Sequence, residues 1–220
     1  MFKKILEKII EFDTIIVHRH KRPDGDCMGT QAGLVHTLRN SFPNKKIYAV
    51  GDDIPGYLSF IGLSDEVSDD LYKDALVIVV DTSVKDRIYD DRYMNGKFLI
   101  KIDHHDDSFP FRENDYLEYI DPRCAACSAI ISRFYTENSD VLKMNKEAAT
   151  ALYTGIVTDT GRFLYRGVDS TLMHATADLL DFDVDIEYIY SKLNLKGINT
   201  YRLEAYVYKH MKMTKSGVVY

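Results

Sequence analysis

A histidine and two aspartates follow the first apolar run of the sequence at a spacing suited to a ligand site. His20 ends the β-rich run 14–20, and Asp24 and Asp26 follow it four and six residues later. A loop at the carboxyl end of a parallel strand is a frequent ligand-binding position. The stretch therefore predicts a ligand-binding loop if other segments supply partners, and otherwise a turn in which Asp26 caps a helix.

Three later segments place acidic or histidine residues directly after apolar runs. Asp81 follows the run 75–80, an Asp-His-His triplet at 103–105 follows the run 98–102, and Asp159 ends an apolar helical pattern. Because the carboxyl ends of parallel strands lie along one edge of a sheet, these groups can converge. Clustered carboxylates repel one another unless cations lie between them. A mixed nitrogen and oxygen set suits Mn²⁺ better than an all-oxygen Mg²⁺ site or a thiolate zinc site.

The candidate ligands divide into two sets that each combine one histidine with two aspartates. The first set is His20, Asp24 and Asp81. The second set is Asp26, His104 and Asp159, with Asp81 as a bridge between the sets. Two ions about 3.5–4 Å apart lower the pKa of a shared water and clamp a phosphoryl group during in-line attack. We therefore predict two metal ions and phosphoester chemistry.

The elements that must position these residues alternate between strands and helices. Apolar periodicity predicts strands at 14–20, 45–50, 75–80, 98–102 and 117–120. It predicts helices at 1–12, 26–42, 128–137, 145–158, 170–181, 184–194 and 197–213. The continuously apolar run 75–80 is typical of a strand buried on both faces. We expect an α/β fold with a doubly wound, mainly parallel sheet flanked by helices, followed by a helical connector.

Composition excludes several classes of protein. A formal net charge of -6 over 220 residues argues against binding of long nucleic acid through a basic surface. The three cysteines are too few for a disulfide framework, and the pair Cys124 and Cys127 favours packing over zinc or redox chemistry. We find no membrane span, and charges in the first helix argue against a signal peptide. We expect a cytoplasmic protein, and the oligomeric state stays open, a homodimer included.

Four segments together resemble the motifs of the DHH phosphoesterase superfamily: HRHKRPDGD, VVDTS, IDHH and GIVTDTGRF. The similarity extends from about residue 14 to residue 185. The form TDTGRF and the helices after it are most similar to bacterial nanoRNases, oligoribonucleases that also dephosphorylate 3′-phosphoadenosine 5′-phosphate. The resemblance implies Mn²⁺, with Mg²⁺ or Co²⁺ as substitutes, on the six residues named above. It implies short single-stranded oligonucleotides or nucleotides as substrates, and hydrolysis by a water that two metals activate.

The resemblance also implies roles for residues outside the two ligand sets. By this analogy His105 faces the substrate phosphate as an acid or charge stabiliser, and Asp103 orients a histidine. Arg162 directly follows the fourth motif and is a candidate substrate contact, with a salt bridge as the alternative. His18 lies deeper along the first strand than His20, and we expect it to pack or to support a ligand.

The resemblance implies a catalytic domain at 1–185 and a helical connector at 186–214. Relatives of this type carry a second, glycine-rich substrate-binding domain, and we expect residues 215–220 to begin it. Two other functions stay open. An inorganic pyrophosphatase of the same superfamily needs a strongly basic pocket, and we find no such cluster in the sequence. A metal- or nucleotide-binding module with little turnover fits a chain that lacks the second domain.

Overall fold

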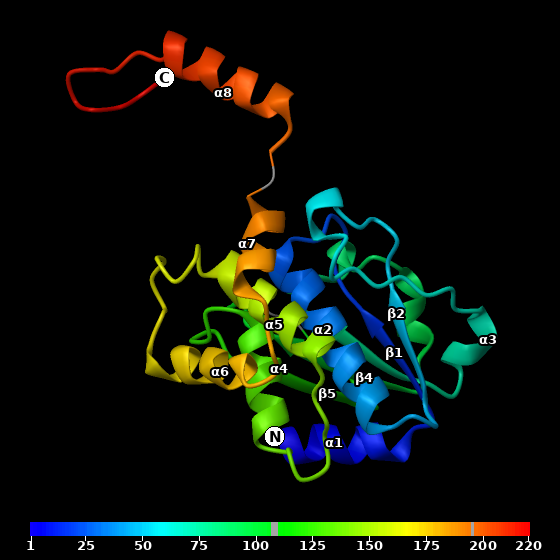
Figure 1. The fold of residues 1–220 in the computed structure, drawn as a ribbon. Helices are drawn as coiled ribbons and strands as arrows, with labels where there is room; N and C mark the ends of the chain where they lie inside the picture. The colour runs from blue at the N-terminus through cyan, green and yellow to red at the C-terminus, as the bar shows by residue number, and fades with distance from the viewer. Residues whose placement is uncertain (107–109, 195) are drawn as a thin grey trace.

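A parallel sheet forms the centre of the computed structural model, which describes residues 1–106, 110–194 and 196–220. Positions 107–109 of the expected catalytic domain and 195 of the expected connector lie outside the described residues. The five strands have the order β2-β1-β3-β4-β5, and all neighbours are parallel. The strands are β1 (Thr14–His18), β2 (Lys46–Val50), β3 (Leu76–Val80), β4 (Phe98–Asp103) and β5 (Tyr116–Ile120). The prediction of an α/β fold with a parallel sheet flanked by helices is confirmed (Figure 1).

The longer helices pack on one face of this sheet, either directly or through one another. They are α1 (Phe2–Glu11), α2 (Gly25–Ser41), α4 (Cys127–Thr136), α5 (Lys146–Asp159), α6 (Ser170–Leu180) and α7 (Ile186–Leu193). Short segments cover the other face: α3 (Asp69–Tyr72), Ile88 directly after the 3-10 helix η2 (Lys85–Arg87), and the 3-10 helix η3 (Asp91–Asn95). A further 3-10 helix, η1 (Gly56–Leu58), packs beside α2. The sheet is therefore covered on both sides.

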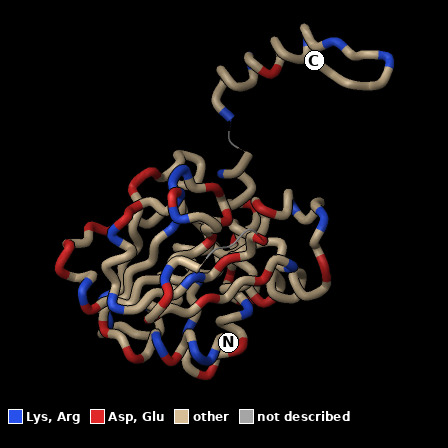
Figure 2. Tube along the Cα trace, turned by 180° about the vertical axis from the view of Figure 1, so that it is seen from behind, with Lys and Arg blue, Asp and Glu red and all other residues tan. Residues whose placement is uncertain are grey.

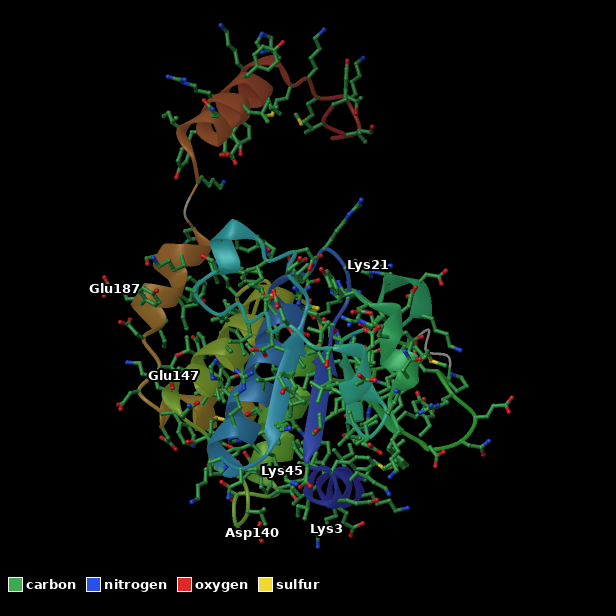
Figure 3. The ribbon with its side chains drawn as sticks, turned by 90° about the vertical axis from the view of Figure 1, so that its right-hand side faces the viewer. Lys3, Lys21, Lys45, Asp140, Glu147 and Glu187 are labelled. Atoms are coloured by element: carbon green, nitrogen blue, oxygen red, sulfur yellow. The ribbon has the colours of Figure 1, made fainter. Side chains whose placement is uncertain are left out.

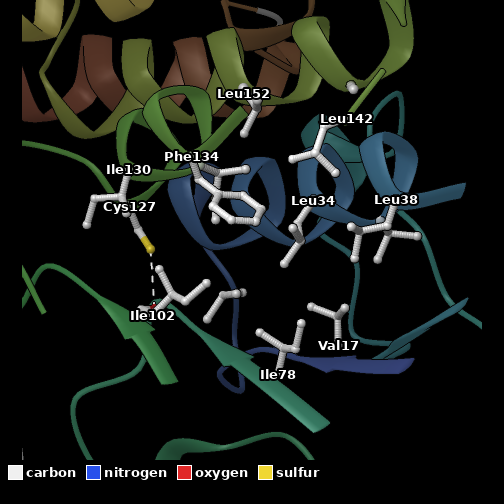
Figure 4. Close-up of a cluster of buried hydrophobic side chains, with 14 of the residues drawn as sticks. Val17, Leu34, Leu38, Ile78, Ile102, Cys127, Ile130, Phe134, Leu142 and Leu152 are labelled. Atoms are coloured by element: carbon white, nitrogen blue, oxygen red, sulfur yellow. Dashed lines mark hydrogen bonds between the residues drawn. The ribbon is translucent and has the colours of Figure 1, made fainter. Parts of the chain in front are cut away.

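Alternation along the strands builds two separate apolar cores. Ile78 and Val80 belong to the core on the helix side, where Leu34 and Phe134 lie above the sheet (Figure 4). Val79 points to the opposite core. Full burial of each side chain of this kind contributes about 1.5–3 kcal/mol relative to exposure. Burial on both faces explains why β3 is apolar throughout, as predicted.

Strand β1 ends earlier than the periodicity predicts, at His18 rather than His20. The chain then pairs in the antiparallel direction with residues 87–89. The Tyr89 amide donates to the Arg19 carbonyl at 2.9 Å, and the Lys21 amide donates to the Arg87 carbonyl at 2.7 Å. This second partner holds the backbone on both sides of His20.

The C-terminal segment extends beyond the end of the body at which the strands terminate. Figure 3 shows Lys21, which follows β1, at this end, and Lys45, which precedes β2, at the opposite end. Helix α8 (Ile198–His210) buries no residue. Residues 215–220 were expected to begin a strand of another domain, and here they turn back through an antiparallel bridge between Met213 and Val219. The domain boundaries stay a prediction.

Among residues 1–106, 110–194 and 196–220, no helix combines the length and the apolar character needed to cross a membrane.

Close contact between α2 and α5 depends on glycine. A Cβ atom added at Gly29 would lie 2.5 Å from the carbonyl oxygen of Ala151 and 2.8 Å from the Cα of Gly155. Both obstacles are backbone atoms, which cannot rotate away. Any side chain at this position therefore pushes apart the helices that carry Asp26 and Asp159.

We expect Gly29→Ala to lower the free energy of unfolding by about 1–3 kcal/mol, the usual cost of overpacking. This sign is opposite to intrinsic helix propensity, which favours alanine over glycine by about 1 kcal/mol. Denaturant unfolding measures the change. Gly56→Ala is the matched control, because a Cβ atom there meets nothing within 4 Å. Unchanged or increased stability of Gly29→Ala would contradict the close packing of α2 and α5.

Candidate metal centre

All six predicted ligands lie at the carboxyl edge of the sheet or at helix ends beside it. The histidines and the central aspartate follow strands β1, β3 and β4, and the others lie on α2 and α5: His20, Asp81, His104, Asp24, Asp26 and Asp159. The chain passes from β2 across β1 to β3, so the connections after β1 and β3 run to opposite sides. Such a switch point is the usual ligand position in an open parallel sheet.

His20 faces the two aspartates of the first predicted set. Its Nε2 lies 3.8 Å from Asp24 Oδ2 and 3.8 Å from Asp81 Oδ2. Its Nδ1 donates to the carbonyl of Lys21 at 2.9 Å, which leaves the lone pair on Nε2. Burial lowers the pKa of His20 and favours the neutral imidazole that a metal requires.

His104 has the same arrangement toward the second set. Its Nε2 lies 3.4 Å from Asp81 Oδ1, 3.6 Å from Asp159 Oδ2 and 3.7 Å from Asp26 Oδ2. Its Nδ1 donates to the carbonyl of Cys124 at 3.1 Å. Hydrogen bonding of the distal ring nitrogen to a carbonyl is the common way to orient a metal-binding imidazole.

Asp81 lies between the two histidines, with one carboxylate oxygen toward each. Oδ1 is buried and has no hydrogen-bond partner among the described residues. The backbone of Asp81 adopts a left-handed conformation with φ of 50°. Such conformations cost about 1–3 kcal/mol and cluster at functional sites. A buried, unpartnered oxygen between two imidazoles fits a bridging ligand of two cations, although the role as ligand stays a prediction for all six residues.

Raised pKa values in this cluster favour protonated side chains, which reduces the repulsion among its carboxylates. Burial and the charge of Asp26 raise the pKa of Asp81 to about 7 and that of Asp159 to about 6. Burial opposes the charged form of His104, but the carboxylates of Asp81, Asp26 and Asp159 outweigh it and raise the pKa to about 10. Metal binding displaces such protons, so the donor set fits divalent cations.

Asp26 is held by α4 and does not cap its own helix, which was the alternative left open by the sequence. Its carboxylate accepts from the amides of Cys127 at 2.6 Å and Ser128 at 2.9 Å. The N-cap of α2 is Asp24, whose Oδ1 accepts from the Cys27 amide at 3.0 Å. The start of α4 thus positions one predicted ligand and the start of α2 another.

Asp103 orients His105, as the resemblance implied for one of the histidines. Asp103 Oδ1 accepts from His105 Nδ1 at 2.7 Å and from the His104 amide at 2.9 Å. Lys101 Nζ lies 3.5 Å from Asp103 Oδ2 and 4.4 Å from the ring centre of Phe111. Lys101 was not among the predicted site residues. The available signal was a single lysine within the apolar strand β4, two residues from Asp103 on the same face.

Arg162 lies against α7 rather than against a carboxylate of the cluster. It donates to Asn194, and its guanidinium lies 5.9 Å from the ring centre of Tyr190. Its backbone φ is 62°, within a left-handed stretch at residues 161–163. Arg162 also lines a cavity of about 210 Å³ together with Tyr57 and Thr158, the residue before Asp159. Its role in substrate binding stays a prediction.

A buried arginine fixes the loop between His20 and Asp24, and sequence reasoning missed its role. Arg19 Nη1 lies 2.6 Å from Asp53 Oδ1, and Asp53 Oδ2 accepts from the Arg22 amide at 2.6 Å. His18 is fully buried and bonds to the Tyr72 hydroxyl at 3.0 Å, so the expected packing role is confirmed. Burial lowers the pKa of His18 to about 3.

Comparison with known proteins identifies the class of this chain. The family model described as "DHH family, N-terminal domain" matches residues 14–156. A Streptococcus mutans protein named "Probable bifunctional oligoribonuclease and PAP phosphatase NrnA" is 42% identical over 216 residues, covering 98% of this chain and 68% of that protein. The bifunctional oligoribonuclease and PAP phosphatase NrnA of Bacillus subtilis is 36% identical over 218 residues, covering 99% and 68%.

These relatives place the chain among the hydrolases that act on phosphoester bonds. Within that class, the chain belongs to the DHH family. The fold agrees: the crystal structure of an exopolyphosphatase-related protein from Bacteroides fragilis has a TM-score of 0.83 at 26% identity, covering 97% of this chain and 66% of that chain. The chain thus spans about two thirds of the length of these relatives.

Proposed function

We propose that this chain is a Mn²⁺-dependent phosphoesterase that hydrolyses short oligonucleotides and 3′-phosphoadenosine 5′-phosphate. The observation that carries the proposal is the position of Asp81 between two imidazoles whose Nε2 atoms face carboxylates. Mixed nitrogen and oxygen donors favour Mn²⁺. The names of the relatives, which combine oligoribonuclease and PAP phosphatase, support the substrate class.

The roles of the side chains follow from their hydrogen bonds. Two divalent ions, when bound, supply Lewis acidity that activates a water and neutralises charge on a phosphoryl group. Asp103 holds the Nδ1 proton of His105, so Nε2 is the ring atom that can exchange a proton with the substrate. The bond to Asp103 raises the pKa of His105, which favours the protonated form. His105 thus acts as a general acid toward the leaving oxygen.

Short substrates fit the charge of the chain. The formal net charge is -6, and acidic and basic residues are interspersed over the face seen in Figure 2. Because the chain is negatively charged overall, a long polyanion makes few favourable contacts away from the metals. The cavity lined by Tyr57, Thr158 and Arg162 is the proposed position of a nucleoside. The unbridged thiols of the three cysteines support a cytoplasmic setting.

A panel of three substrates tests the proposal. With Mn²⁺ we expect turnover of a labelled diribonucleotide and of 3′-phosphoadenosine 5′-phosphate, loss of turnover with a chelator, and recovery when Mn²⁺ is restored. Turnover of pyrophosphate alone would assign the chain to the pyrophosphatases instead. Stoichiometric metal binding without turnover of any of the three would favour a binding module.

A further inference from the structure

A buried thiol lies beside the first ligand set and belongs to neither set. Cys27 is the third residue of α2 and is fully buried. Its Sγ, a ring nitrogen of His20 and a carboxylate oxygen of Asp81 lie within 4.8 Å of one another. The cluster is therefore a possible three-ligand metal position that includes sulfur.

The spacing of these atoms is close to that of ligands on one ion. Ligand bonds to a metal such as zinc are about 2.0–2.3 Å long, so opposite ligands lie about 4.6 Å apart, and these three atoms lie within 4.8 Å of one another. Asp24 ties the thiol to the histidine: Oδ1 accepts from the Cys27 amide at 3.0 Å, and Oδ2 lies 3.8 Å from His20 Nε2. Asp81 is also buried and directs its Oδ2 toward the same ring nitrogen of His20, at 3.8 Å.

The thiol changes which ions this position prefers. Carboxylate and imidazole ligands suit Mn²⁺, whereas thiolate selects softer ions such as Zn²⁺ and Co²⁺. Cys27 adds sulfur to His20 and Asp81, and Asp24 faces the same imidazole, so four mixed donors are available at this position. A thiophilic ion can therefore use a ligand that Mn²⁺ does not need.

We propose that Cys27 is a ligand for thiophilic divalent ions at the His20–Asp81 position, where such an ion excludes Mn²⁺. Binding forms the bond between Sγ and the metal and breaks the S–H bond, whose proton passes to solvent. The inference rests on the proposed function only in that Mn²⁺ is the working ion. It makes zinc an inhibitor that competes with Mn²⁺ for one of the two positions.

The other two thiols are engaged elsewhere and provide matched controls. Cys124 Sγ donates to the carbonyl of Ala126 at 3.3 Å, and Cys127 Sγ donates to the carbonyl of Ile102 at 3.4 Å (Figure 4). Neither belongs to a candidate metal group among the described residues.

Titration of the metal-free chain with Co²⁺ tests the proposal without any substrate. The wild-type chain is expected to develop a thiolate-to-Co²⁺ charge-transfer band in the near ultraviolet. Cys27→Ser should lose this band, and Cys124→Ser should keep it. In competition against Mn²⁺, the affinity of Cys27→Ser for Zn²⁺ should fall by at least about tenfold. Co²⁺ binding by the wild-type chain without the band would overturn the proposal, as would a band that survives in Cys27→Ser.

A second variant keeps the proposal testable if Cys27→Ser does not fold. The double variant Cys124→Ser and Cys127→Ser retains Cys27 as its thiol, so it must show the band. Its absence, with Co²⁺ bound, overturns the proposal. If the band forms but Mn²⁺ supports no turnover, the proposed function fails and the Cys27 site stands. If turnover is present and the band is absent, only the Cys27 site fails.

Discussion

Asp81→Ala is expected to remove both bound ions and to lower turnover by roughly 10³-fold, because metal ions supply several kcal/mol of transition-state stabilisation. Asp81 directs one oxygen toward His20 and the other toward His104, so its loss affects both positions. Metal analysis after loading with Mn²⁺ measures the effect. We expect about two ions per chain in the wild-type protein, as in other two-metal sites, and fewer than one in the variant.

Two other aspartates make this result specific. Asp24→Ala should lose mainly one ion, because Asp24 faces His20 with one oxygen and caps α2 with the other. Asp70→Ala should lose none, because Asp70 forms an exposed pair with Lys73. Equal and mild losses in Asp24→Ala and Asp81→Ala would contradict the bridging position.

His105→Ala is expected to lower kcat by about 10²–10⁴-fold, the usual contribution of a general acid or base, while both ions stay bound. The reason is the bond from His105 Nδ1 to Asp103, which fixes the ring but leaves Nε2 for the substrate. Parallel measurements of kcat and metal content separate this role from metal binding. Asp103→Asn should lower kcat by less, because the ring keeps a weaker partner.

The separation matters because His105 also lies close to Asp81, at 3.8 Å from Nδ1 to Oδ1. Loss of an ion in His105→Ala would make His105 a ligand and contradict its role as an acid. His174→Ala on α6 is the control, because this histidine lies on an exposed part of the helix. It should leave both kcat and metal content unchanged.

The sequence was sufficient for most of the sheet and for the members of the cluster. The run 75–80 could be assigned because a strand buried on both faces must be apolar at every position, and β3 is such a strand. The proximity of Asp81 and His104 could be predicted because strand ends of a parallel sheet converge. Both predictions depend on short sequence patterns: an uninterrupted apolar run, and acidic or histidine residues directly after such a run.

Contacts between distant segments could not be predicted in the same way. The early end of β1 results from pairing of Arg19 and Lys21 with residues 87–89, and no periodicity indicates that partner. The buried cations Arg19 and Lys101 depend on Asp53 and Asp103, which the sequence shows only as ordinary turn or strand-end aspartates. Arg162 could not be placed because its left-handed backbone turns the side chain toward α7.

The two ligand sets become complete at different points along the chain. The first ends at Asp81, within the segment that forms β1, α2, β2 and β3. The second needs Asp159 at the end of α5, which must dock on α2 through Gly29. During synthesis, the first set and the segments that hold it, residues 87–89 beside His20 and β4 beside Asp81, emerge before Asp159 does. If hydrolysis depends on both ions, as proposed, it begins only after α5 has left the ribosome and packed on α2, so the emerging chain holds an incomplete two-ion site near the ribosome's own RNA.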